Sequence, residues 1–250
     1  MNIILLGGTG GIGKCLSYQL SKKNNLFISS TNKNKLKKLT SSIEETNNLN
    51  LNTKHISGAV LDVNNFNEIE SFLSHGNKQL GSIDCIINCI GSLLLKPAHL
   101  TTEEELINTY SINVFSCFGI LKYGFKFLKK NGGNIIFFSS AAAQIGLKNH
   151  DAIASAKAAV SSLALSASST YARYNIRVNT IAPGLVDTPL TEKITSNQLS
   201  YNYSKNLHGL NKIGSPKNFI PIINSLIDKR SDWITGQTFT IDGGLSTMKG

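Results

Sequence analysis

A glycine-rich turn near the start of the chain constrains the fold more than any other feature. The apolar run 2–6 leads directly into Gly7-Gly8-Thr9-Gly10-Gly11-Ile12-Gly13, and an amphipathic segment follows at once. Glycines let the backbone adopt positive φ and approach an anion closely, and a following helix aims its free N–H groups at that anion. The sequence therefore predicts a strand, a turn and a helix that bind the pyrophosphate of a dinucleotide.

These glycines fit two registers. Gly8, Gly10 and Gly13 match the usual G-x-G-x-x-G fingerprint, and Gly7, Gly11 and Gly13 match a second pattern, G-x-x-x-G-x-G. A short motif is weak evidence by itself, and a glycine-rich hairpin or loop is the alternative. The strand before the turn and the helix after it favour the dinucleotide site.

The size and composition of the chain are those of one globular unit. With 250 residues, 41% of them hydrophobic, we expect a single dinucleotide-binding domain over 1–250. No apolar run approaches the roughly 20 residues that a membrane helix needs. The first apolar run follows Met1 directly, without the features of a signal peptide. We therefore expect a soluble cytoplasmic protein with no membrane partner.

The net charge of +10 raises the question of a nucleic-acid partner. Only Arg173, Arg177 and Arg230 are arginines, and the lysines are scattered rather than clustered. We therefore expect no nucleic-acid binding. The four cysteines lie in apolar segments without C-x-x-C spacing, which argues against both disulfides and a metal site; they are Cys15, Cys85, Cys89 and Cys117.

Strand-like and helix-like segments alternate along the chain. Apolar runs predict strands at 2–6, 26–30, 56–61, 83–88, 134–139, 177–182 and 238–241, and helical spacing predicts helices at 12–23, 36–43, 69–73, 102–130, 152–174 and 220–227. Thr101 or Thr102 is the expected N-cap of the fourth helix. Such alternation predicts an α/β fold, a Rossmann-type doubly wound parallel sheet of about seven strands with helices on both faces. The polar stretch 185–215 shows little periodicity, and we expect it to form a substrate lid within the domain.

Several landmarks in this order resemble the classical short-chain dehydrogenase/reductase family over nearly the whole chain. The glycine turn, Asp62-Val63 after the third strand and Asn88-x-x-Gly91 after the fourth match the family pattern. So do Arg177-Val178-Asn179, Pro183-Gly184 with Thr188, and Asp242-Gly243-Gly244. The resemblance, together with the end of the second strand, implies these cofactor-binding residues: Gly7, Gly11, Ile12, Gly13, Thr31, Asp62, Val63, Asn88, Gly91, Lys157, Pro183, Gly184 and Thr188.

The resemblance also implies a catalytic set, with one departure. Asn113, Ser140 and Lys157 stand at the family's catalytic asparagine, serine and lysine, but Ile153 stands where the family has its tyrosine. A positioned acid typically contributes 10²–10⁴-fold to such a reaction, and isoleucine has no proton to give. Two other Tyr-x-x-x-Lys matches occur, Tyr18–Lys22 in the opening helix and Tyr201–Lys205 in the expected lid.

The absent tyrosine leaves two functions open. The first is an NAD(P)-dependent oxidoreductase that moves a hydride between a nicotinamide cofactor and a small alcohol or carbonyl substrate. His150, Tyr201 or a water would then supply the proton, His150 because histidine titrates near neutral pH. An exposed loop histidine and an N-cap Asp151 are the alternative interpretations of that segment. The second function is a cofactor-binding regulatory or scaffold protein with little or no turnover.

The end of the second strand predicts a preference for NADP(H), with NAD(H) possible. An NAD site places a carboxylate there for the ribose 2′-OH, whereas this chain has Ser30-Thr31-Asn32, with Lys33 and Lys35 close behind. These cations and hydroxyls suit a 2′-phosphate, although the two lysines are also typical of a solvated helix face.

Two further expectations concern partners. Apolar residues flank the expected reacting centre and indicate an apolar pocket for a small molecule; they are Leu93, Leu94, Ala141, Ile145, Leu147 and Leu185. The helix from Ala152 to Tyr174 is rich in small residues, and the family resemblance implies that it pairs with a second copy in a homo-oligomer, a dimer or tetramer.

Overall fold

The computed structural model describes residues 1–49 and 54–248. In this part of the chain all seven strands form one parallel sheet, in the order β3-β2-β1-β4-β5-β6-β7. The predicted doubly wound sheet is therefore confirmed. The strands are β1 (Asn2–Leu6), β2 (Asn25–Ser30), β3 (Ile56–Val60), β4 (Cys85–Asn88), β5 (Gly133–Phe138), β6 (Ile176–Pro183) and β7 (Thr238–Ile241).

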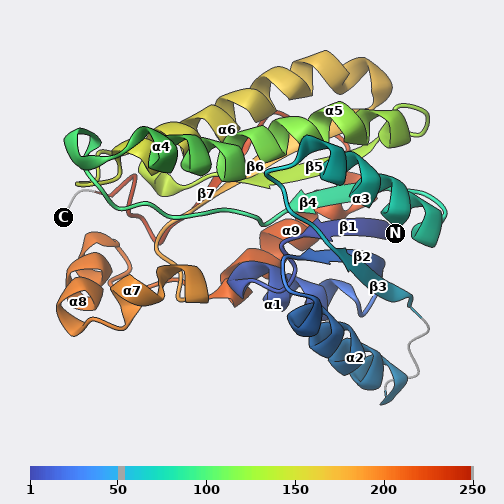
Figure 1. Cartoon of the computed structure of the whole chain (residues 1–250), viewed down its shortest axis with the longest axis horizontal. Helices are drawn as coiled ribbons and strands as arrows, with labels where there is room; N and C mark the ends of the chain where they lie inside the picture. Colours follow the sequence, from blue (N-terminus) through green and yellow to red (C-terminus); the bar gives the residue numbers. More distant parts are fainter. Residues whose placement is uncertain (50–53, 249–250) are drawn as a thin grey trace.

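Helices cover both faces of the sheet (Figure 1). Alternate strand residues point to opposite faces, so Ile4 and Leu6 belong to one core and Ile3 and Leu5 to the other. The first core packs under α3 (Phe66–Leu80), α5 (Ser116–Leu128) and α6 (Asp151–Tyr171). The second packs under α1 (Gly11–Leu20), α2 (Lys33–Leu49) and α9 (Ile220–Ile227). Among the described residues, no helix is both long and apolar enough to cross a membrane.

The long helix predicted over 102–130 is interrupted. Thr102 caps α4 (Glu103–Tyr110) in a reciprocal capping box with Glu105, as one of the two expected N-caps. A π-helical segment, Ser111–Phe115, then separates α4 from α5, and the Ser116 N–H donates to the Ser111 carbonyl five residues back. The chain is helical from Glu103 to Leu128, close to the predicted bounds, but the π-helical turn was not predicted because a single wide turn leaves the apolar periodicity on each side intact.

The segment 185–215 contains helices that the sequence analysis did not predict. They are α7 (Glu192–Thr195) and α8 (Gln198–Leu207), the second capped by the Asn197 side chain, which accepts from the Ser200 N–H. The segment is polar as expected, but α7 is only one turn long, which is too short to show a helical period. The Asn-rich turn expected before β3 includes residues 50–53, which lie outside the described residues.

The order of the strands changes direction between β1 and β4: β2 and β3 are added on one side of β1, and β4 to β7 on the other. In open parallel sheets, ligands bind at such a switch point, beside the carboxyl ends of the strands. Here the loops after β1, β4, β5 and β6 all leave from that edge.

Candidate active site

The glycine turn joins β1 to α1. Gly7 has a φ of 72° and donates its N–H to the Ser29 Oγ at 2.9 Å. A Cβ at Gly13 would overlap the Gly7 carbonyl oxygen, so only glycine lets the helix start this close to the strand. The first-turn N–H groups of Gly11, Ile12 and Gly13 have no intrahelical acceptor, and Gly10 at the N-cap has no side chain to supply one. This set of donors fits a diphosphate.

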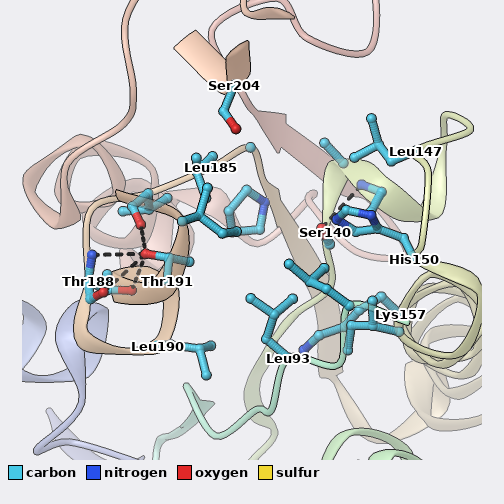
Figure 2. A pocket seen from close by; sticks show the side chains of 18 of the residues that line it. Leu93, Ser140, Leu147, His150, Lys157, Leu185, Thr188, Leu190, Thr191 and Ser204 are labelled. Atoms are coloured by element: carbon cyan, nitrogen blue, oxygen red, sulfur yellow. Dashed lines mark hydrogen bonds between the residues drawn. The ribbon is translucent and has the colours of Figure 1, made fainter. Parts of the chain in front are cut away.

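Thr188 packs directly on this turn from the segment that follows β6. A Cβ at Gly11 would lie 2.5 Å from the Thr188 Cβ, so glycine makes room for the Thr188 side chain on the turn. The Thr188 N–H donates to the Thr191 Oγ at 3.2 Å, and the Thr191 hydroxyl donates to the Val186 carbonyl at 2.5 Å (Figure 2). These bonds hold the loop in a compact turn beside the glycines.

The end of β2 lies beside the turn and carries no acidic side chain. The buried Ser30 hydroxyl bonds the Thr9 hydroxyl at 2.7 Å and accepts from the Asn32 N–H. The neighbouring Thr31 is exposed. Lys33 and Lys35 are exposed at the start of α2. Past β3, Asp62 is exposed and Val63 is buried.

Lys157 and Asn113 converge on Gly91 from two different helices. A Cβ at Gly91 would lie 3.1 Å from the Asn113 Oδ1 and 3.3 Å from the Lys157 Nζ. Asn113 sits in the π-helical segment, where its Nδ2 donates to the Ser92 Oγ and the Thr109 carbonyl, both at 2.8 Å. A side chain at residue 91 would press on both polar groups, and glycine leaves them room.

Lys157 is a buried cation. Its Nζ donates to the Phe138 carbonyl at 2.9 Å, and burial lowers the pKa of its amine, opposed in part by the neighbouring Cys117 and Cys89 thiols. A buried amine with this single acceptor has further donors to offer to a ligand.

Ser140, His150 and Ile153 face one cavity of about 830 Å³ between the sheet edge and the 185–215 segment (Figure 2). The Ser140 Oγ accepts from the Ala142 N–H at 3.1 Å, which leaves its own proton available. Ile153 is buried on α6, one turn before Lys157. His150 holds the N-cap position of α6, with its Nδ1 2.7 Å from the Lys148 carbonyl.

The alternative interpretation of Asp151 as an N-cap was wrong. Asp151 is the first residue of α6, and its Oδ2 accepts instead from the Ala98 N–H at 2.6 Å. The carboxylate thus ties the loop after β4 to the start of α6, and His150 takes the cap position without a capping side-chain bond in the described structure.

The expected site residues divide between the cavity wall and its supports. Those that line the cavity are Ile12, Gly91, Ser140, Lys157, Pro183, Gly184 and Thr188, with the predicted apolar residues Leu93, Ala141, Leu147 and Leu185. The others lie outside the lining: Gly7, Gly11, Gly13, Thr31, Asp62, Val63, Asn88, Asn113, Leu94 and Ile145. Asn88 is buried and its Nδ2 donates to the Cys117 Sγ at 3.3 Å, so it supports the wall from behind.

Neither alternative tyrosine reaches the cavity lining. Tyr18 donates its hydroxyl to the Ser42 Oγ at 3.0 Å, between α1 and α2. Tyr201 is half-buried on α8 and does not line the cavity, whereas Tyr203, two residues later, does.

Comparison with known proteins agrees with this geometry. The family model described as "Enoyl-(Acyl carrier protein) reductase" matches residues 7–246. The chain belongs to the short-chain dehydrogenase/reductase family. The family binds nicotinamide cofactors, and its members named below are oxidoreductases.

Three relatives illustrate the similarity. A chloroplastic tropinone reductase homologue of Arabidopsis thaliana is 26% identical over 98% of this chain and 76% of the relative. The L-2,3-butanediol dehydrogenase of Corynebacterium glutamicum is 32% identical over 74% of this chain and 76% of its own length. A solved short-chain dehydrogenase/reductase from Mycobacterium ulcerans is 26% identical, covers 99% of this chain and 90% of its own, and superposes with a TM-score of 0.91.

Two cavity residues of this short-chain dehydrogenase/reductase were missed by sequence analysis. His208 is buried at the end of α8, and its Nε2 accepts from the Leu185 N–H at 3.2 Å. Tyr203 lies one turn earlier on the same helix, between Leu199 and Leu207 at four-residue spacing. That spacing was the available signal, and it was overlooked because the segment as a whole is polar.

Proposed function

We propose that the chain is an NAD(P)-dependent oxidoreductase that transfers a hydride between a nicotinamide cofactor and a small alcohol or carbonyl substrate. One observation carries this proposal: Ile12 of the glycine turn, Ser140 and Lys157 all open onto the same cavity. The free N–H groups of α1 would hold the pyrophosphate of such a dinucleotide, and Ser140 and Lys157 line the cavity that begins beside them. The nicotinamide ring supplies or accepts the hydride when it is bound.

The chain's own residues position and polarise the reacting oxygen. Ser140 donates a hydrogen bond from its hydroxyl to that oxygen, because its Oγ already accepts from the Ala142 N–H. Lys157 adds a buried positive charge beside Gly91, which favours a developing alkoxide in a site shielded from water. Asn113 is a positioning residue, since its side chain holds Ser92 in the wall.

We propose His150 as the proton donor in place of the tyrosine that Ile153 replaces. The Nδ1 proton is held by the Lys148 carbonyl, and the ring lines the same cavity as Ser140. The imidazolium passes its proton to the alkoxide oxygen and recovers one from solvent. The alternative of a regulatory protein without turnover is less favoured, because the relatives named above are reductases and dehydrogenases.

The experiment measures cofactor binding and turnover separately. NADPH fluorescence titration, followed by a turnover assay with a panel of ketones, is carried out on the native chain and on Gly13→Val. We expect Gly13→Val to lose cofactor binding, because its side chain would overlap the Gly7 carbonyl. Gly146→Val is the control, since a Cβ there meets no atom within 4 Å among the described residues. Undiminished binding in Gly13→Val would refute the proposed cofactor site, and binding without turnover would favour the regulatory alternative.

Segment 185–215 is proposed as the lid of this site. Its helices α7 and α8 supply one wall of the cavity, and along the chain it lies between the end of β6 and the turn that leads into α9 (Figure 1).

A second copy of the chain is the proposed macromolecular partner. Phe118 on α5 and Leu165 on α6 are exposed apolar side chains on two helices that lie side by side on the outer face of the molecule (Figure 1). Burying this face against a second copy removes apolar surface from water. Light scattering at micromolar concentration is expected to give at least a dimer, and Leu165→Glu is expected to weaken it while Leu100→Glu, at an exposed site elsewhere, does not.

A further inference from the structure

The cavity wall contributed by α8 is apolar and left open to water. Leu199, Tyr203 and Leu207 follow one another at four-residue spacing, so they share one face of the helix, and all three line the cavity. Their exposed fractions are 82%, 62% and 39%. Exposed apolar surface on a helix that faces a cavity is unfavourable unless a ligand covers it.

Other parts of the cavity wall are apolar as well. Leu95 and Leu190 are exposed and line the cavity from the loop after β4 and from the turn before α7. Leu93, Leu147 and Leu190 point into the same space from three sides (Figure 2). Apolar walls on several sides of about 830 Å³ suit a ligand with an extended hydrocarbon part.

The charges at the cavity have one sign. Among the described lining residues there is no Asp or Glu, whereas Lys148, Lys157 and Lys193 are present. Lys157 is buried at the reacting end, but Lys148 and Lys193 are exposed, which places them at the rim. Neither rim lysine forms an ion pair within the described residues. A rim of this kind attracts an anion, and both lysines are available to pair with it.

We propose that the cavity binds an elongated apolar compound with an anionic group, which Lys148 and Lys193 hold at the rim while the hydrocarbon part covers the α8 face. That such a compound reacts at a carbonyl group rests on the function proposed above, whereas its binding in the cavity does not. The anionic group is a carboxylate or a phosphate ester, since lysine pairs with either as a point charge.

Calorimetric titration tests this without requiring turnover. The probes are hexanoate, octanoate, decanoate, decyl phosphate and 1-decanol, each added to the whole chain with and without NADP⁺. We expect each added methylene to tighten binding by about two- to fourfold, because it covers more of the apolar wall. We also expect decanoate to bind about three- to tenfold tighter than 1-decanol, the modest gain that exposed ion pairs provide. Decanoate against decyl phosphate then identifies the preferred anion.

Matched variants distinguish the effect of the two rim lysines from the effect of the protein's net charge. Lys148→Gln/Lys193→Gln is expected to remove the advantage of decanoate over 1-decanol, and Lys37→Gln/Lys38→Gln on α2, with the same loss of charge, is expected to keep it. Leu199→Asn/Leu207→Asn is expected to weaken decanoate and 1-decanol alike. Equal affinity for decanoate and 1-decanol, no dependence on chain length, or displacement of decanoate by NADP⁺ would overturn the proposal. The separate NADPH titration distinguishes this failure from failure of the proposed cofactor site.

Discussion

The imidazole of His208 connects the end of α8 to Leu185, the residue that follows the β6 turn. Its Nε2 accepts from the Leu185 N–H at 3.2 Å, and its Nδ1 donates to the Ser204 carbonyl at 2.7 Å. With 4% of its surface exposed, the ring uses both nitrogens in the neutral tautomer. A second proton would set the Nε2–H against the Leu185 N–H, so the contact requires the neutral ring.

We expect His208→Ala to loosen the proposed lid. The substitution leaves the Leu185 N–H without its acceptor, which costs about 1–3 kcal/mol for a buried donor. Urea unfolding measures this loss of stability, and limited proteolysis measures faster cleavage within 192–207. His55→Ala is the control, because the His55 side chain is exposed on the approach to β3, where its Nε2 lies 3.0 Å from the Ser57 Oγ. Equal effects of the two variants would mean that His208 does not hold the segment.

In a His150→Ala background, which lacks the proposed proton donor, Ile153→Tyr is expected to raise ketone reduction by about 10²–10⁴-fold, the usual contribution of a positioned acid. Residue 153 lies one helical turn before Lys157 and lines the cavity, so a phenol there faces the reacting oxygen. Steady-state assays compare it with Ile153→Phe, which has the ring without the hydroxyl. No gain in a folded variant that still binds cofactor would show that the remaining site is not assembled for this chemistry.

Thr31→Asp is expected to shift cofactor preference from NADPH toward NADH. A carboxylate at the end of β2 repels a ribose 2′-phosphate and accepts hydrogen bonds from a free 2′-OH. Dissociation constants for both reduced cofactors at fixed salt should show at least about tenfold weaker NADPH binding, which is the effect of 1.4 kcal/mol. Thr31→Asn has nearly the same shape without the charge and should leave NADPH binding almost unchanged. Tighter binding of NADH than NADPH by the native chain would refute the preference.

The buried amine of Lys157 is expected to make stability depend on pH in the alkaline range. Because burial lowers its pKa in the folded chain, the unfolded chain binds more protons between that lowered pKa and about 10.4. The free energy of unfolding therefore rises with pH in this window, by at most about 1.4 kcal/mol per pH unit.

Urea unfolding from pH 7 to pH 10 isolates this contribution when Lys157→Met is compared with the native chain. We expect the component to vanish in Lys157→Met and to persist in Lys37→Met, where the lysine is exposed. Parallel pH profiles for the native chain and Lys157→Met would contradict the assignment.

The parts of the fold predicted from sequence are those with a strong local signal. Strands β1 and β5 are buried on both faces, so their residues form continuous apolar runs that few other structures produce. The glycine turn could be predicted equally well, because the close contact between Gly13 and the Gly7 carbonyl joins residues only six positions apart. The roles expected of Asn113, Lys157 and Gly91 came from the family resemblance rather than from spacing, and their contact was not predicted.

The features that were missed depend on contacts far apart in the sequence or on one turn of backbone. Leu185 and His208 are 23 residues apart, and nothing local marks them as partners. The Asp151 carboxylate meets the Ala98 N–H across 53 residues, so a strong N-cap preference was overridden by tertiary structure. Helices α7 and α8 are short and polar, and their apolar side chains face a cavity rather than the core.

Because of the π-helical segment Ser111–Phe115, this region depends more on its number of residues than on which residues they are. Its extra residue is accommodated because the Ser116 hydroxyl and the Cys117 thiol donate to the Ile112 and Asn113 carbonyls. Deleting one residue would restore regular helix and rotate α4 relative to α5 by about 100°. The π-helical turn thus sets the rotation of α4 relative to α5 about the helix axis. We therefore expect the helix to accept many substitutions on its surface but no single-residue deletion or insertion.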